Sequence, residues 1–197
     1  MKDAQVKELV LQSLAHERGG VKIYETALEC AVNEDLKEEW ESYLEQTRKH
    51  VQALSTVCEA LKLDPQEETP GGRILRKMGA ALVAAMQEAK SGGNEEAAQL
   101  VACECVVFAE TKDHLDWELL GEVAKELKGK EQEVLLRAYE EIEDEEDEYL
   151  YHTRGWCREL WLDSLGVKAV LPPPEERRDA RSAIGAARAQ EARTKMS

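Results

Sequence analysis

Glu and His side chains, which normally face water, stand inside the apolar stripes of four long segments of this chain. They are Glu17 in the first segment, His50 in the second, Glu110 and His114 in the third, and Glu145, Glu148 and His152 in the last. A protein interior does not hold unpaired carboxylates unless a cation or protons compensate their charge. Carboxylate and imidazole groups that converge inside a helical bundle are therefore candidate metal ligands.

Helical periodicity predicts that these side chains point inward. Side chains seven residues apart in an α-helix differ by only about 20° in direction. Glu17 shares a face with Val10 and Tyr24 in this way, and Glu145 lies near the direction of Tyr149 and Trp156. Apolar neighbours at this spacing mark the face of a helix that packs against the core. Two pairs, Glu110–His114 and Glu148–His152, also have the i, i+4 spacing that lets two side chains reach one ion.

The candidate ligands also match in depth along the predicted helices. Glu17 and His50 are nearly the same number of residues from a turn near Asn33, and a turn near Gly129 relates the last two segments in the same way. The predicted layer contains Glu17, His50, His114 and Glu145, with Glu110 and Glu148 one turn further along. Placing both pairs of helices at one height assumes that a crossover joins them.

The composition and the stop signals predict an all-α fold. Ala, Glu, Leu, Lys and Gln are plentiful, and Gly and Pro are sparse inside the long segments. Asn33, Thr69 and Asn94 read as helix N-caps, with Pro70 in a first turn. The predicted helices are Lys2–Val32, Glu34–Leu61, Gly72–Lys90, Glu95–Leu127 and Glu131–Leu165. We expect residues 1–168 to form the bundle and residues 169–197, which begin near three prolines, to be a disordered tail.

Four of the predicted helices are long, and the one at residues 72–90 is short. The expected arrangement is two antiparallel hairpins joined by a crossover that contains the short helix. A plain up-and-down bundle with the short helix as a lid is the alternative.

The charge and the cysteines limit the classes of function. The formal net charge is −15, from 41 acidic residues against 26 Lys and Arg, which argues against nucleic acid or an anionic membrane as a partner. The sequence has no apolar run long enough to cross a membrane and no secretory signal at its start. The five cysteines form no CxxC pair. Reduced thiols in a cytoplasmic protein are the expectation.

These residues resemble the ferritin-like superfamily of diiron-carboxylate four-helix bundles, over about Lys2–Leu165. Glu17 with Tyr24 is similar to the family's first-helix Glu and its nearby Tyr. The matches to later family ligands are His50, Glu110, and Glu145 with Glu148. The resemblance implies two iron or manganese ions between the helices that activate O₂ or peroxide. Tyr24 or Tyr43 would supply a hydrogen bond or an electron near the metal.

The chain departs from the family pattern at particular positions. The family has a Glu three residues before the second-helix His, and this chain has Thr47 there. His114 is an additional imidazole, and the last helix has no Glu-xx-His. We therefore expect an altered site of one or two ions, with iron favoured and manganese or zinc possible.

Three functions remain open from the sequence. The first is a ferritin-like metal-binding protein whose partners are metal ions and a small oxidant. The second is a non-catalytic, homodimeric helical bundle in which buried Glu–His pairs are structural. The third is a hydroxylase that uses the same metal centre on an organic substrate. No Gly-rich phosphate loop or CxxC metal knuckle indicates another chemistry.

Overall fold

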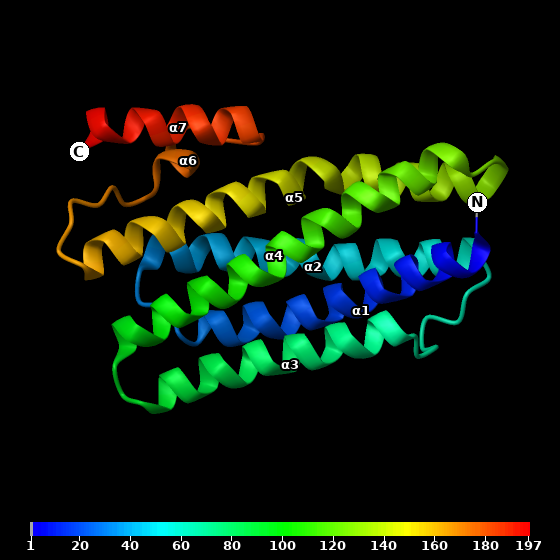
Figure 1. Ribbon diagram of the computed structural model, residues 1–197, viewed down its shortest axis with the longest axis horizontal. Helices are drawn as coiled ribbons and strands as arrows, with labels where there is room; N and C mark the ends of the chain where they lie inside the picture. The colour runs from blue at the N-terminus through cyan, green and yellow to red at the C-terminus, as the bar shows by residue number, and fades with distance from the viewer. Residues whose placement is uncertain (1) are drawn as a thin grey trace.

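A computed structural model describes residues 2–197, and it confirms the all-α prediction. The described residues form helices and no strand, and the helix ends lie within a few residues of the predicted ones (Figure 1). The helices are α1 (Asp3–Leu28), α2 (Glu34–Ala60), α3 (Pro70–Ser91), α4 (Glu95–Glu126), α5 (Gly129–Ser164), α6 (Pro174–Arg177) and α7 (Ala183–Met196).

The long helices form two antiparallel hairpins, α1 with α2 and α4 with α5 (Figure 1). Helix α1 also packs against α4, and α2 packs against α5, so the four helices surround one interior. Helix α3 lies along α1 and α4 and carries the chain back, so that α4 begins at the same end of the bundle as α2. The short predicted helix thus lies in a crossover between the two hairpins.

Three polar side chains fix the starts of the central helices as predicted. The side chain of Asn33 accepts a hydrogen bond from the Leu36 N–H, and Asn94 caps α4 in the same way. The Thr69 hydroxyl accepts a hydrogen bond from the Gly72 N–H, and Pro70 is the first residue of α3. Each cap satisfies one N–H that has no partner within the helix.

The apolar core is divided into two clusters along the bundle. One cluster contains Tyr24, Trp40, Tyr149 and Trp156, and the other contains Trp117 with aliphatic side chains near the opposite end. The break between the clusters falls between Leu14 and Ile23 on α1, Leu44 and Leu54 on α2, Ala109 and Trp117 on α4, and Ile142 and Tyr149 on α5. A polar layer at one depth therefore crosses all four helices.

None of the described helices combines the length and apolar character needed to cross a membrane. All five cysteines are free, and four of them are buried. Burial raises the pKa of the Cys58 thiol to about 11, so this thiol stays protonated near neutral pH.

The residues after α5 fold back onto that helix, whereas residues 169–197 were expected to form a disordered tail. Glu159 on α5 is fully buried, and it accepts hydrogen bonds from the Val170 N–H at 2.8 Å and from Arg193 Nε at 2.7 Å. Arg158, beside Glu159, binds both oxygens of Glu175 at 2.7 and 2.8 Å. Composition could not reveal these partners, because they come from α5 rather than from within the tail.

Replacing Glu159 with Ala should release the tail. The change leaves Arg193 and the Val170 N–H without their acceptor, and we expect a loss of about 2–3 kcal/mol of stability. Limited proteolysis should then cut residues 166–197 faster than in the unmodified protein. Glu133→Ala, at an exposed position of the same helix, is the control. Equal cleavage of both variants would contradict this docking of the tail.

Candidate metal centre

Three side chains from three helices meet in the polar layer. Glu17 on α1, His50 on α2 and Glu146 on α5 offer ligand atoms that all lie within 4.8 Å of one another. His50 Nδ1 is 3.1 Å from Glu146 Oε1 and 3.4 Å from Glu17 Oε1. Their exposed fractions are only 0 %, 1 % and 2 %, in the order Glu17, His50, Glu146. One imidazole and two carboxylates facing one point can hold one metal ion.

Helix α4 adds two more buried carboxylates, Glu110 and Asp113. The negative charges of Glu17 and Glu146 act on both of them, so the five groups share one electrostatic environment. We call Glu17, His50, Glu110, Asp113 and Glu146 the carboxylate cluster. All four long helices contribute to it, and its four acids outnumber its single imidazole.

Neighbouring donors satisfy only part of the carboxylate cluster. Trp117 Nε1 donates to Glu17 Oε1 at 2.8 Å, and the Tyr24 hydroxyl donates to Glu110 Oε1, also at 2.8 Å. The atoms that make no hydrogen bond of good geometry are Glu17 Oε2, Glu110 Oε2, Asp113 Oδ1, both carboxylate oxygens of Glu146, and His50 Nδ1, although His50 Nδ1 lies 3.1 Å from Glu146 Oε1. Buried polar atoms are nearly always paired in proteins. The unpaired carboxylate oxygens can therefore take up protons or a cation.

The pKa shifts in the cluster show the same excess of negative charge. Burial raises the pKa of Glu146 to about 7, although His50 opposes the shift. Burial also raises the pKa of Glu110 and of Asp113 well above their usual values, and neighbouring carboxylates add to both shifts. Burial lowers the pKa of His50, but the adjacent Glu17, Glu145 and Glu146 raise it well above the usual value overall. Without a metal ion, the cluster thus retains protons near neutral pH.

Glu145 contacts the other side of the His50 ring. Its Oε2 lies 2.9 Å from His50 Nε2, and Gln46 Nε2 donates to its Oε1 at 3.4 Å. A proton on Nε2, donated to Glu145, leaves the lone pair of Nδ1 facing Glu17 and Glu146. A carboxylate that orients a histidine in this way is a common feature of metal sites. Glu145 is therefore placed to position His50 rather than to join the cluster.

The structure brings together three of the seven metal-ligand candidates from the sequence, Glu17, His50 and Glu110. Glu145 is adjacent to them, with a side chain that is 35 % exposed. His114 pairs with Asp147 instead, at the outer side of α4 and α5. Glu148 lies 3.4 Å from Arg181, and His152 pairs with Glu39 at 3.1 Å. The predicted single layer therefore does not include His114, Glu148 or His152.

Sequence reasoning missed Glu146 and Asp113, although a periodic signal was present for both. Glu146 lies four residues after Ile142 and three before Tyr149, and both of these are buried on α5. Asp113 lies three residues after Glu110 and four before Trp117 on α4. The inward face predicted for the last helix was aligned with Trp156 and with Val134, which is only half-buried. That alignment placed Glu145, rather than its neighbour Glu146, in the interior.

The two tyrosines predicted near the metal have different surroundings. Tyr24 is buried, and its hydroxyl donates a hydrogen bond to Glu110. Tyr43 donates to Glu39 instead, and its ring lies 4.0 Å from the ring of Tyr149 between centroids. Of these two tyrosines, Tyr24 alone donates a hydrogen bond to the carboxylate cluster.

No protein-family model matches this chain, and neither a curated protein nor a solved structure does.

Proposed function

We propose that this protein is a metal-binding helical bundle with redox activity toward O₂ or peroxide. The observation that supports the proposal most strongly is the carboxylate cluster, with four acids and one His buried at one depth and six atoms without hydrogen bonds. An apolar core does not retain such a group for stability alone, because each uncompensated charge costs several kcal/mol.

The donor set fits iron or manganese, which accept both carboxylate and imidazole ligands, and zinc also fits. Glu17, His50 and Glu146 would hold one ion, and Glu110 with Asp113 would contribute to a second. Such an ion would supply the change of oxidation state that activates O₂ or peroxide. Trp117 and Tyr24 hold Glu17 and Glu110 in place through their hydrogen bonds. The two apolar clusters exclude water on both sides of the layer.

We also propose that the chain is a divergent member of the ferritin-like superfamily. Two antiparallel hairpins and a crossover that makes α2 and α4 parallel support this assignment (Figure 1). Thr47 stands where the family has a carboxylate, and its hydroxyl donates to the Tyr43 carbonyl of its own helix. A Cβ at Gly20 would lie 3.2 Å from Thr47 Cγ2, so α1 and α2 approach closely here and leave little room for a Glu. Glu146 and Asp113 would supply carboxylates in its place.

Elemental analysis of protein purified without a metal-affinity tag tests the proposal. We expect about one or two equivalents of iron or manganese after expression with either metal. Calorimetric titration of metal-free protein with Mn²⁺ should give the same stoichiometry and raise the melting temperature. Protein that stays free of metal, with a melting temperature unchanged by Fe²⁺, Mn²⁺ or Zn²⁺, would reject the metal-binding function.

A non-catalytic interaction protein is the second candidate. Protons on Glu110, Asp113 and Glu146 would compensate the cluster without a metal, because burial raises the pKa of each of them. Helices α3 and α4 also expose large apolar side chains, among them Met78 and Phe108, which a homodimer would cover. A metal-free protein that elutes as a dimer, and becomes monomeric after Phe108→Glu, would favour this candidate.

A further inference from the structure

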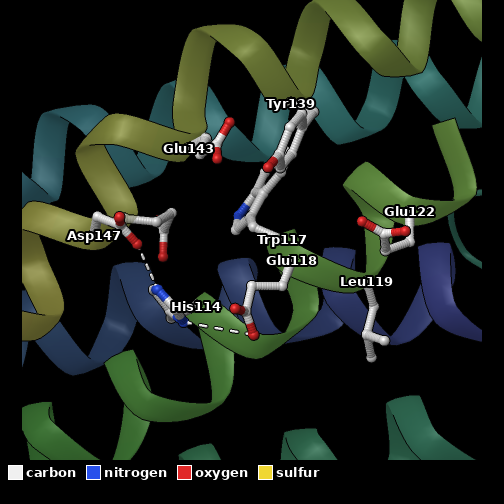
Figure 2. A pocket seen from close by; sticks show the side chains of 9 residues that line it. His114, Trp117, Glu118, Leu119, Glu122, Tyr139, Glu143 and Asp147 are labelled. Atoms are coloured by element: carbon white, nitrogen blue, oxygen red, sulfur yellow. Dashed lines mark hydrogen bonds and ion pairs between the residues drawn. The ribbon is translucent and has the colours of Figure 1, made fainter. Parts of the chain in front are cut away.

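An acidic hollow lies between α4 and α5 (Figure 2). Its volume is about 390 Å³. Glu118 and Glu122 of α4 lie on one side of it, and Glu143 and Asp147 of α5 lie on the other. Tyr139 forms part of a wall, because its ring occupies the space next to Gly121, where a Cβ would lie 2.5 Å from the ring.

The inner wall of the hollow belongs to the candidate centre. Glu146 and Trp117 both line the hollow, and they are only 2 % and 1 % exposed. Neither carboxylate oxygen of Glu146 has a hydrogen-bond partner. Glu146 also faces His50 Nδ1, and Trp117 donates to Glu17. The hollow therefore ends at two side chains that contact the ligand atoms of the cluster.

The other lining groups suit a hydrated cation. Five acids and one His line the hollow, with no Lys or Arg among them. Lys125 pairs with Glu122 at the rim, but Glu118 and Glu143 are exposed, and no Lys or Arg among the described residues pairs with either of them. At about 30 Å³ per water, an ion with six waters needs roughly 200 Å³, which this hollow provides. A concave surface of one charge sign concentrates the opposite ion and speeds its association.

His114 and Asp147 lie part-way between the rim and the inner wall. His114 Nε2 contacts Asp147 Oδ1 at 2.5 Å, and its Nδ1 lies 4.0 Å from Glu118 Oε2. The His114 side chain is 17 % exposed, between the exposed Glu118 and the buried Glu146. An imidazole and a carboxylate at this depth can replace waters of an entering ion one at a time.

We propose that this hollow is the loading site through which a hydrated divalent transition-metal ion reaches the carboxylate cluster. Glu118 and Glu143 attract the ion, His114 and Asp147 exchange part of its hydration shell, and Glu146 receives it at the inner end. This inference rests on the proposed function, because it requires that the cluster bind metal.

A second hollow, on another face of the bundle, offers a matched comparison. This hollow of about 380 Å³ lies over α2 and α5, and Asp35, Glu38 and Glu148 are among its acids. No member of the carboxylate cluster lines it. The two hollows are alike in size and charge sign, but only the first reaches the ligand atoms.

Stopped-flow binding of Co²⁺ to the metal-free full-length protein, followed by its visible absorption, tests the proposal. We expect E118Q/E143Q to lower the association rate constant about tenfold at low ionic strength and to weaken its dependence on salt. The stoichiometry at saturation should stay that of the unmodified protein, because neither residue belongs to the cluster. D35N/E38Q, which removes two charges from the second hollow, should change the rate less than twofold. Both pairs are exposed, and far-UV circular dichroism should verify an unchanged fold.

The possible outcomes separate the two proposals. Unmodified protein that binds no Co²⁺ rejects the metal-binding function and the loading site together. Normal binding with equal slowing in both variants would show an effect of total charge, and slowing only in D35N/E38Q would place the access route at the second hollow. Either result overturns the loading site and leaves the proposed metal binding intact.

Discussion

Replacing Glu146 with Gln should remove most of the bound metal and at the same time stabilise the metal-free protein. Gln cannot supply the anionic oxygen that faces His50 and Glu17, and loss of one ligand should weaken metal affinity by at least about 100-fold. In the metal-free protein, however, Gln resembles the protonated acid and removes one buried charge from a group of like charges. We expect about 2 kcal/mol more stability at pH 8, or roughly 4–8 °C in melting temperature.

Opposite effects on metal affinity and on stability distinguish a ligand from a structural acid. Calorimetric titration with Mn²⁺ gives the first quantity, and thermal unfolding in the presence of a chelator gives the second. Glu140→Gln is the matched control, since Glu140 is an exposed acid on the same helix and should change neither quantity. A Glu146→Gln protein that is destabilised without metal would indicate that this carboxylate supports the fold instead.

The metal-free protein should lose stability as the pH rises from about 4.5 to 7. The pKa of Glu146 is about 7 in the folded protein, against 4.5 as its ordinary value. Between these values the folded state holds a proton that the unfolded state releases, so the stability gained from that proton is complete below pH 4.5 and lost by pH 7. At 1.36 kcal/mol per unit, Glu146 alone accounts for about 3 kcal/mol.

Other groups in the cluster add to this pH dependence. The pKa values of Glu110 and Asp113 are also raised, so their contributions fall with rising pH in the same direction. The pKa of His50 is raised as well. Its contribution to stability is therefore complete below pH 6.5 and is lost as the pH rises through the pKa of His50 in the folded protein. Glu145 opposes them, because the hydrogen bond with His50 lowers its pKa, but its side chain is partly exposed.

Urea unfolding at pH 5, 6, 7 and 8 with a chelator present measures this dependence. Saturating Mn²⁺ should flatten or reverse it, because the metal competes with the protons for the same ligands. The Glu146→Gln protein should show a slope smaller by about the contribution of Glu146. A metal-free protein whose stability rises from pH 5 to pH 8 would contradict a cluster that holds protons.

The helices and their starts follow from local signals in the sequence. Asn33, Thr69 and Asn94 each cap the helix predicted to begin there, because a cap depends on side-chain and backbone atoms only three residues apart. Periodicity also placed Glu17, His50 and Glu110 inside, since each stands amid several apolar residues on one face. A small error in the assumed helix phase therefore leaves each of these three residues on the inward face.

The acidic run on α5 shows where periodicity fails. From Glu143 to Glu148 every residue is acidic, so the residue type gives no indication of which one faces the interior. A rotation of 100° separates Glu145 from Glu146, and contact with α2 decides that Glu146 meets His50 Nδ1 while Glu145 meets Nε2. The docked tail depends in the same way on contacts distant in sequence, such as that between Glu159 and Arg193.

The sequence by itself determined an acidic, all-helical chain with capped helices and with three of the five residues in the carboxylate cluster. Only the tertiary structure decided that Asp113 and Glu146 complete the cluster, that His114 lies outside it beside an acidic hollow, and that Glu145 orients His50. Helical periodicity defines a face about 100° wide, which several residues share. The meeting of individual atoms depends on how the four helices rotate and pack against one another, and no local pattern encodes that choice.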